Sequence, residues 1–393
     1  MRFPEFTGEW KMATFGDIAK GFDYGMNAAA KSFDGNNKYI RITDIDEVSS
    51  QYLYDDVVSP DGELEDRYLV KENDILLART GASTGKSYLY RNSDGKLYFA
   101  GFLIRANIYK HNSYFVFSQL HTLRYKKWIS VMSARSGQPG INSQEYASFP
   151  VYTTSLQEED KIATFLKLLD ERIITQNKII EKYESLIQAM CDTLIESDQH
   201  KVELAFSDFG KSYSGLSGKS AGDFGEGCPY ITYMNVYQNQ IIDTTNIGLV
   251  KINGTEQQSV VHYGDILFTL SSETAEEVGM GAVYLGDTYP LYLNSFCFGI
   301  HIIDENKIFP PFLAFYVSTR SFRKVVFPLA QGSTRFNLQK NDFMKKGFSF
   351  PTVERQRNIY SALKTYSDKL SVEKSLAKLL CKQKNHLLSQ LFI

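Results

Sequence analysis

The sequence predicts an α+β fold built as a tandem duplication. Two mixed α/β domains are each followed by a long helix, and the two helices form an antiparallel coiled coil. Three observations predict this fold: short aromatic-rich runs indicate strands, similar runs recur in the second half, and each half ends in a long heptad pattern. A chain of 393 residues with 43% hydrophobic residues is long enough for two domains that each bury a core.

Strand signals in the first half lie between turn-forming Gly, Asn and Asp residues. Each run mixes β-branched and aromatic side chains, which is typical of strands. The main examples are KYIRITDI (residues 38–45), DILLART (74–80) and KLYFAGFLIRANIY (96–109). The first half is therefore expected to contain a series of short strands.

The second half repeats this series. Tyr39–Arg41 is matched by Tyr230–Thr232, and Asp74–Leu76 is matched by Asp265–Leu267, both at an offset of 191 (230 − 39 and 265 − 74). Two further pairs lie at larger offsets: residues 135–142 with 330–337 at 195, and Phe149-Pro150 with Phe350-Pro351 at 201. Drifting offsets indicate loop insertions between two copies of one domain, with a period too long for a solenoid repeat.

A long helical pattern follows the first domain, because no Gly or Pro occurs from Val151 to Ser197. Its apolar positions alternate spacings of four and three residues, which is the heptad seam of a coiled coil. The predicted seam consists of Ile162, Leu166, Leu169, Ile173, Gln176, Ile180, Tyr183 and Ile187, with Gln176 as the polar member. A helix of about forty residues would span about 60 Å.

The second copy ends in an equivalent seam, displaced by 197 residues (359 − 162). It consists of Ile359, Leu363, Tyr366, Leu370, Glu373, Ala377 and Leu380, with Glu373 in the place of Gln176. Two equivalent seams most simply pack on each other as an antiparallel pair that holds the globular copies apart. The alternative is that each helix lies on its own domain. The predicted segments are residues 1–152 and 199–352 for the domains, and 153–198 and 353–393 for the helices.

Composition limits the class of protein. The net charge of −2 and the pI of about 6.3 argue against a wholly basic nucleic-acid coat protein, so nucleic-acid contacts must come from particular loops. The four cysteines and six histidines show no metal-ligand spacing, so we expect reduced thiols and no metal site. With no apolar run long enough for a bilayer and no signal peptide, we expect a cytoplasmic protein without a membrane segment.

The stretch GASTGKS (residues 81–87) is close to a phosphate-binding loop, but Thr80 stands where the motif requires its first glycine. The corresponding region of the second copy, residues 269–285, is acidic and lacks the lysine. A nucleotide-binding enzyme that uses Gly81–Ser87 stays as an alternative. Two other enzyme motifs fail. Residues 309–312 read FPPF, without the polar first residue of an amino-methyltransferase loop, and residues 59–67 lack the lysine of a nuclease site.

Loops that combine cations, glycine and small polar residues are the candidates for DNA contacts. Arg and Lys contact phosphates, Arg, Asn and Gln read base edges, and glycine permits close approach of the backbone. One such loop alone is more often a solvated turn, but these recur at corresponding positions in both copies. The predicted residues of the first copy are Arg41, Thr43, Arg79, Thr80, Ser83, Lys86, Arg135, Gln138 and Asn142. Those of the second copy are Thr232, Asn235, Thr269, Ser271, Glu273, Gln331, Ser333, Arg335 and Asn337.

Several motifs occur in the same order in both halves. NDILLART (73–80) pairs with GDILFT (264–269), QPGIN (138–142) with QGSTRFN (331–337), and FPV (149–151) with FPT (350–352). The helices open with LQEEDKIA (156–163) and VERQRNI (353–359), and the chain opens with RFPEFTGEWK (2–11). Each motif is weak alone, but their doubled order covers essentially the whole chain. In this order they resemble the specificity subunit of a bacterial type I restriction-modification enzyme.

The resemblance implies two target-recognition domains, each reading one half of a split, asymmetric double-stranded DNA sequence. It also implies that the helix pair acts as a ruler and as the docking surface for two methyltransferase subunits. Those partners would bind S-adenosylmethionine and methylate adenine at N6. Restriction subunits would add translocation and cleavage that need ATP and Mg, so no cofactor is expected in this chain.

One stretch departs from the family pattern, the acidic loop around Glu273. Either Glu273 accepts a hydrogen bond from cytosine N4, or its loop faces away from DNA. A further alternative for the whole chain is a coiled-coil scaffold without a role in DNA binding.

Overall fold

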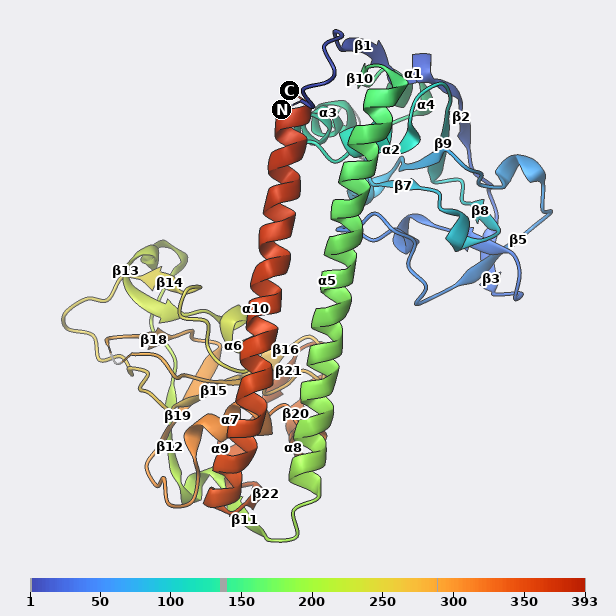
Figure 1. Cartoon of the computed structure of the whole chain (residues 1–393). Coiled ribbons are helices and arrows are strands. Elements are labelled where there is room, and N and C mark those ends of the chain that lie inside the picture. Colours follow the sequence, from blue (N-terminus) through green and yellow to red (C-terminus); the bar gives the residue numbers. More distant parts are fainter. Residues whose placement is uncertain (1, 135–139, 288, 393) are drawn as a thin grey trace. The chain divides into compact units, whose positions relative to one another are not determined.

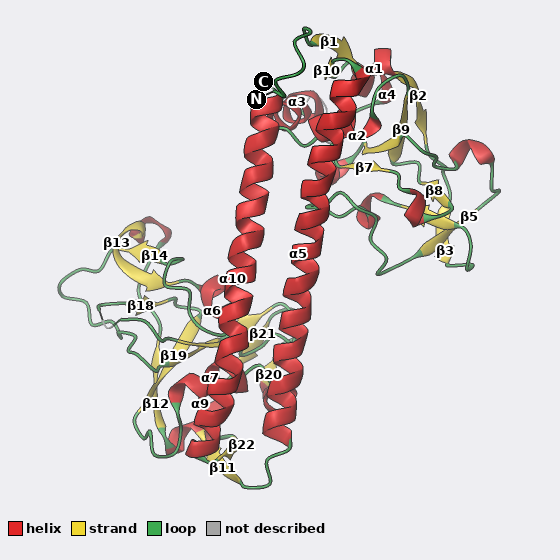
Figure 2. Cartoon of the chain, viewed as in Figure 1, coloured by secondary structure: helices red, strands yellow, loops and turns green. Residues whose placement is uncertain are grey.

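The computed structural model describes residues 2–134, 140–287 and 289–392. The chain divides into two compact units, one formed by the chain up to Lys178 together with the segment from Lys374, the other by Ile179 to Glu373. Both units mix helices and strands (Figure 2). The predicted α+β class is confirmed, and each unit includes a part of both long helices.

The first unit is built around a four-stranded antiparallel sheet with the strand order β2-β9-β6-β7. The antiparallel pairs β1-β10 and β3-β5 and the parallel pair β4-β8 complete its strands. The strands are β1 (Lys11–Thr14), β2 (Ala19–Tyr24), β3 (Ala29–Ser32), β4 (Lys38–Ile40), β5 (Val58–Asp61), β6 (Asp74–Ala78), β7 (Ser87–Leu89), β8 (Leu97–Phe99), β9 (Leu103–Ile108) and β10 (Pro150–Thr153). The helices are α1 (Phe15–Ile18), α2 (Ser113–Gln119), α3 (Leu123–Ser133), α4 (Ser143–Ala147), the first part of α5 (Leu156–Glu196) and the end of α10 (Val353–Leu391).

The second unit has an equivalent antiparallel sheet with the order β12-β19-β15-β17. The pair β11-β22 and the three-stranded groups β14-β13-β18 and β16-β21-β20 complete it. The strands are β11 (Lys201–Ala205), β12 (Gly210–Ser214), β13 (Phe224–Ile231), β14 (Gly248–Val250), β15 (Ile266–Thr269), β16 (Ser271–Ser272), β17 (Gly281–Val283), β18 (Tyr292–Leu293), β19 (Cys297–Ile302), β20 (Ala330–Gln331), β21 (Phe336–Leu338) and β22 (Gly347–Pro351). The helices are α6 (Tyr233–Gln238), α7 (Pro310–Tyr316), α8 (Arg320–Val326), α9 (Lys340–Lys345), the end of α5 and the first part of α10 (Val353–Leu391).

The two units repeat one topology, which confirms the predicted duplication. The four-stranded sheets correspond strand by strand, the pair β1-β10 corresponds to β11-β22, and the parallel pair β4-β8 corresponds to β13-β18. Single hydrogen bonds recur as well. Ala100 N donates to Ile40 O at 3.0 Å, and Asn294 N donates to Ile231 O at the same distance.

Two of the predicted runs are divided in the structure. Residues 96–109 form β8 and β9, because β8 pairs with β4 in parallel whereas β9 pairs with β2 and β6 in antiparallel. The chain turns between them, and Leu103 N donates to Ala100 O at 2.8 Å. The run at 38–45 ends as a strand at Ile40 and continues as a 3₁₀ turn at Ile42–Asp44. A local apolar pattern does not reveal such turns, since the partners of each strand lie far away in the sequence.

Helix α5 has 41 residues and α10 has 39, and neither is interrupted. In the first unit, the beginning of α5 lies beside the end of α10, so the helices run antiparallel (Figure 1, green and red). The Asp170 Oδ1 and Lys384 Nζ atoms form an ion pair at 2.6 Å, and Leu388 shares a hydrophobic core with Ile162 and Leu166. Among the described residues, no helix combines the length and the apolar character needed to cross a membrane.

In the second unit, the end of α5 and the beginning of α10 share another core, with Ile187 and Cys191 from α5 and Ile359 and Leu363 from α10. The packing of the two helices on each other is thereby confirmed. Both cores also contain sheet residues, such as Ile75 in the first and Ile266 in the second. Each end of the helix pair therefore also lies on the globular part of its own unit.

Most of the predicted seam is buried. The fully or largely buried positions are Ile162, Leu166, Ile173, Gln176, Ile187, Ile359, Leu363, Glu373 and Leu380. The partly buried positions are Leu169, Ile180, Tyr183, Leu370 and Ala377. Tyr366 is a correction to the prediction: the residue is 37% exposed, so it lies at the margin of the seam, which a tyrosine tolerates because its ring is apolar and its tip polar.

The motif that opens each long helix joins the helix to its domain. Glu159 Oε2 accepts a hydrogen bond from Asn112 N at 2.9 Å, and Gln356 Oε1 accepts one from Phe309 N at 2.8 Å. The two acceptors are 197 residues apart (356 − 159) and both are fully buried. The backbone groups they satisfy lie just before α2 and α7. The motif therefore fixes the start of α5 against α2 and the start of α10 against α7.

Candidate nucleic-acid interface

The end of β6 forms the centre of the predicted site in the first unit. Arg79 N donates to Phe102 O at 3.1 Å, and Ile141 N donates to Arg79 O at 2.9 Å, so three separate segments meet at this residue. The Arg79 guanidinium donates from Nε to Gly101 O at 3.1 Å and lies over the Tyr24 ring, 5.0 Å from its centroid. Thr80 pairs with Gly140 in an antiparallel bridge beside it.

A hollow of about 650 Å³ lies next to this edge. Its lining brings together three of the predicted DNA-binding residues, Arg41, Thr43 and Arg79, with the aromatic rings of Tyr24 and Phe102. Burial acts to raise the pKa of Tyr24, but a hydrogen bond from Ser143 N and the nearby Arg79 charge outweigh it and lower that pKa. The hollow thus combines cations, a hydroxyl and exposed aromatic surface.

Two predicted cations of the first unit are already paired with carboxylates. The Arg41 guanidinium lies 2.7 Å from Asp44 Oδ1 and 2.9 Å from Asp56 Oδ2, and the hydrogen bond to Asp44 raises the pKa of Arg41. Lys86 Nζ lies 3.5 Å from Glu47 Oε1, and only 16% of its side chain is exposed. Contact between DNA and either residue stays a prediction, and it would require competition with these acids.

The loop at Gly81–Ser87 does not have the backbone of a nucleotide site. Residues Gly81–Ser83 form a single 3₁₀ turn, and the chain continues from Ser87 as strand β7. A phosphate-binding loop instead leads into the N-terminus of a helix, whose amides and dipole hold the phosphates. Gly81 and Gly85 have positive φ values of 72° and 92°, so the glycines serve a tight turn between two strands.

Asn142 is exposed and begins α4, where its Oδ1 accepts a hydrogen bond from Glu145 N at 2.9 Å. This capping contact uses Oδ1, so the side-chain amide nitrogen of Asn142 is not engaged in it and is a potential donor. Ser83 and Thr80 are partly exposed on the neighbouring loop. The remaining predicted residues of this copy, Arg135 and Gln138, lie outside the described residues.

In the second unit, the sheet β16-β21-β20 brings three predicted residues side by side. Ser271 pairs with Asn337, and Asn337 pairs with Gln331 on the opposite strand. The turn between β20 and β21 carries Ser333 and Arg335, both exposed, and Gly332 has a φ of 130°. A side chain at Gly332 would collide with Arg335 O, so this tight turn requires glycine. Glu273 is exposed beyond the end of β16.

Two predicted DNA-binding residues of this unit are wrong. Asn235 is 1% exposed, and its Nδ2 donates to Asp243 O and Asn246 O at 2.9 and 2.7 Å. Thr269 is fully buried in β15, and its hydroxyl accepts a hydrogen bond from Met280 N at 3.1 Å. Both side chains are enclosed by protein and organise loops. Thr232 is partly exposed and caps α6 by accepting from Asn235 N at 3.2 Å.

Two exposed phenylalanines, one in each unit, were not among the residues predicted from the sequence. Phe102 is 60% exposed and accepts from Arg79 N, and Phe296 is 58% exposed and accepts from Leu270 N at 2.8 Å. Leu338 N in turn donates to Leu270 O at 2.8 Å, as Ile141 N does to Arg79 O. The internal repeat could have identified this pair. The segments FAGFL (99–103) and LNSFC (293–297) both have phenylalanine at the fourth position, 194 residues apart (296 − 102).

The structure also assembles side chains that could hold a metal ion. His262, Asp265 and His301 place one ligand atom each within 4.8 Å of one another. The sequence predicted no metal site because these residues lack a short ligand spacing. The sheet brings them together across 39 residues (301 − 262).

The family model of the type I restriction modification DNA specificity domain matches residues 7–185 and 208–380. Each match covers one globular domain and most of the helix that follows it. The chain belongs to this family. Its two halves are specificity domains, which we call the first and the second specificity domain. In type I restriction-modification systems this family recognises DNA sequence and is non-catalytic.

Solved structures share the fold of the whole chain. The crystal structure of a type I restriction-modification S subunit from M. genitalium matches with a TM-score of 0.59 and 17% identity, covering 98% of this chain and 96% of that one. A chain from a study of complex assembly and conformational transition of the type I R-M system matches with a TM-score of 0.52 and 13% identity, covering 97% of both. A comparison with curated proteins finds no match.

Proposed function

We propose that this chain is the DNA-reading subunit of a bacterial type I restriction-modification complex. Each specificity domain would read one half of a bipartite, asymmetric DNA sequence. The chain would dock two adenine-N6 methyltransferase subunits, and restriction subunits would join the assembly. S-adenosylmethionine, ATP and Mg would bind to those partners, and the complex would act on DNA in the cytoplasm.

The observation that carries this proposal is the edge repeated in both specificity domains. In each domain, the residue that follows the central strand, β6 or β15, donates a backbone hydrogen bond to an exposed phenylalanine in a neighbouring turn. Large exposed aromatic side chains at the same place in two diverged copies favour contact with a partner over a purely structural role. Apolar side chains contact thymine methyl groups in the major groove or wedge between base steps in the minor groove.

The polar groups around each phenylalanine suit the reading of base edges. In the second domain, Gln331, Ser333, Arg335 and Asn337 lie on or beside one two-stranded hairpin. The major groove accepts a two-stranded ribbon, and arginine and asparagine form forked hydrogen bonds with guanine and adenine. In the first domain, Arg79 and Thr43 line the hollow beside Phe102. The two domains carry different side chains at equivalent backbone positions, which supports the reading of two different half-sites.

The helix pair offers a surface for the methyltransferase subunits. Leu168 of α5 and Leu379 of α10, both in the first unit, are each 61% exposed. Leucines exposed on a helix pair favour a partner that covers them. We therefore expect Leu168→Asp together with Leu379→Asp to prevent assembly with the methyltransferase, seen by size-exclusion chromatography, without change in the thermal unfolding of the isolated chain.

A domain exchange tests the proposal directly. Replacing residues 1–150 by the corresponding domain of another specificity subunit should replace one half of the methylated sequence and leave the other half and the spacer unchanged. Mapping of N6-methyladenine across a bacterial genome, with and without the gene, provides the measurement. If both halves changed together, or if methylation were unaffected by loss of the chain, the proposal would be wrong.

A further inference from the structure

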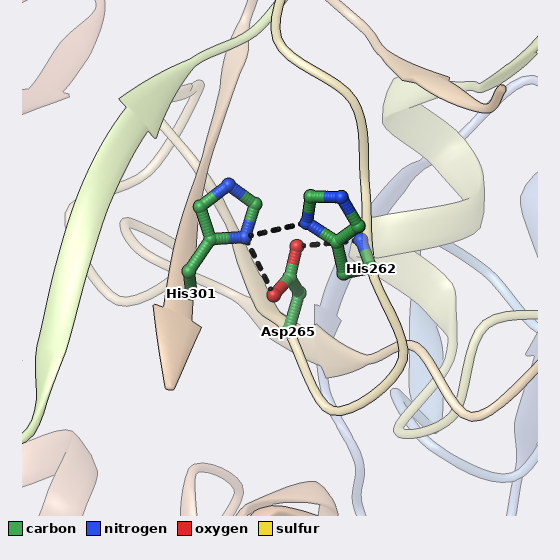
Figure 3. Close-up of side chains that lie close together, drawn as sticks. All are labelled: His262, Asp265 and His301. Carbon is green, nitrogen blue, oxygen red and sulfur yellow. Dashed lines mark hydrogen bonds and ion pairs between the residues drawn. The ribbon is translucent and has the colours of Figure 1, made fainter. Parts of the chain in front are cut away.

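We propose that His262, Asp265 and His301 form a binding site for a divalent transition-metal ion, Zn²⁺ in the cell, which fastens the segment before β15 to strand β19. Figure 3 shows the three side chains converging. The Nδ1 atoms of His262 and His301 face each other at 3.3 Å, and His301 Nδ1 lies 2.9 Å from Asp265 Oδ1.

The facing nitrogens match the geometry of a zinc site. Two ligands bound to one tetrahedral Zn²⁺ at about 2.0–2.1 Å lie about 3.3 Å apart, which agrees with the separation of the two Nδ1 atoms. Imidazole nitrogen and carboxylate oxygen together form the ligand set of sites that keep an open position for water. His262 is exposed, so an ion from solvent has access to the cluster.

The carboxylate is held in place by groups that leave one oxygen for the ion. Asp265 Oδ2 accepts hydrogen bonds from Tyr213 Oη at 2.7 Å and from His262 N at 2.8 Å, while Oδ1 faces His301. The Tyr213 ring also stacks on the His301 ring, with centroids 4.2 Å apart. Outer contacts of this kind orient metal ligands and maintain their geometry.

The first specificity domain provides an internal comparison. Its Asp74 is equivalent to Asp265 and also accepts from the backbone three residues earlier, at Lys71 N, with a distance of 2.8 Å. The partner of its other oxygen is Asn107 Nδ2 at 2.7 Å, where the second domain has His301. The aspartate therefore stabilises the same turn in both domains. The two histidines occur only in the second domain. The first domain has lysine and asparagine at the corresponding positions and adopts the same fold, so the fold does not require histidine there.

The cluster lies away from the proposed DNA-reading edge. His262 and Asp265 precede β15, whereas Ser271 and the β16-β21-β20 sheet follow its other end. The metal would thus stabilise the second domain and order the segment 251–265 without contacting DNA. This assignment does not depend on the proposed function, because binding of the ion is measurable in the isolated chain.

The test uses the untagged full-length chain after removal of metals with a chelator. Titration with Zn²⁺ in competition with a chromophoric chelator should show one ion bound per chain, and Co²⁺ should give the ligand-field absorption of a four-coordinate site. Zn²⁺ should also raise the unfolding temperature. The variant His262→Lys/His301→Asn carries the residues of the first domain, so it should fold and should bind at least about 100-fold more weakly.

Two further variants complete the design. His386→Asn changes an exposed histidine on α10 and should bind Zn²⁺ as the wild type does. His262→Ala removes one exposed ligand and replaces the double variant if that variant fails to fold; it too should lose affinity and the thermal shift. Binding of Zn²⁺ by the double variant with wild-type affinity, or no stoichiometric binding by the wild type, would overturn the proposal and leave a hydrogen-bonded triad.

Discussion

Phe102 and Phe296 occupy the same position in two copies of one domain, and both are largely exposed. Each phenylalanine accepts a backbone hydrogen bond from the residue at the end of the central strand, Arg79 in one domain and Leu270 in the other. A buried role would require apolar neighbours around these rings, yet 60% and 58% of the residues remain accessible. This relationship supports our proposal that the equivalent edge of each specificity domain is the surface that contacts DNA.

Removal of either ring should weaken binding of one half-site only. We expect Phe102→Ala and Phe296→Ala each to lower the affinity of the assembled methyltransferase for its target about tenfold, or about 1.4 kcal/mol. The unfolding temperature should stay the same, because both rings are exposed. Val131→Ala on α3 is the matched control, since Val131 is 63% exposed. Fluorescence anisotropy with oligonucleotides altered in one half-site would show which half each variant affects, and equal loss on unrelated DNA would contradict the assignment.

Asn235 and Asn337 should behave in opposite ways. Asn235→Ala removes the buried side chain that donates to the carbonyls of Asp243 and Asn246, and the loss of these hydrogen bonds costs about 1–3 kcal/mol of unfolding free energy. Asn337→Ala removes an exposed side chain and should change stability by less than about 0.5 kcal/mol. Only Asn337→Ala should reduce DNA affinity once folded protein is compared. Urea unfolding and DNA titration separate the two effects, and a large DNA defect in folded Asn235→Ala would contradict its structural role.

Arg335 should contribute more to DNA binding than Lys86 does. Lys86 is paired with Glu47, whereas Arg335 is exposed on a hairpin turn. We expect Arg335→Ala to lower the slope of log affinity against log salt by about one and Lys86→Ala to have a smaller effect. The isolated chain should bind no ATP with or without Lys86. Tight ATP binding that is lost in Lys86→Ala would instead support the nucleotide-binding alternative.

Lengthening the helix pair should lengthen the spacer between the half-sites. Asp170 pairs with Lys384, so Gln176 lies opposite Lys378 in an antiparallel register (176 − 170 = 384 − 378). Seven residues inserted after Gln176 and seven before Lys378 add about 10 Å to each helix, or about three base pairs of DNA. Methylation mapping should show a longer spacer with unchanged half-sites. The control inserts seven residues into α5 alone, which should disrupt the pairing and abolish methylation.

His121 should make the stability of the first unit depend on pH. Burial, followed by the charge of Lys384, lowers the pKa of His121 from 6.5 to about 4. Nδ1 donates to Phe117 O and Nε2 accepts from Ser50 Oγ, both at 3.0 Å, which is a neutral ring. The unfolded chain binds the proton first, so stability is complete above pH 6.5 and declines toward pH 4 by up to about 3 kcal/mol. Denaturation between these pH values should show the decline in the wild type and a flatter profile in His121→Phe.

Much of the architecture followed from local patterns. The spacing of Ile162, Leu166 and Ile173 identifies a helical seam, because burial in a helix recurs every three or four residues. The duplication followed from repeated strings such as DIL at 74–76 and 265–267. Both signals lie in short stretches of the sequence, so they can be recognised without knowledge of the fold.

The individual functional residues depended on contacts between distant segments. Asn235 and Asn337 are the same residue type, yet Asn235 lies in α6 and is bonded to the carbonyls of residues 243 and 246, whereas Asn337 is exposed on β21. Lys86 meets Glu47, 39 residues earlier (86 − 47), and His262 meets His301 only because β15 pairs with β19. Neither composition nor periodicity contains information about contacts between residues so far apart in the sequence. The order of domains and helices was thus readable in the chain, while exposure, ion pairing and the metal-ligand cluster were decided when strands far apart in the sequence came together.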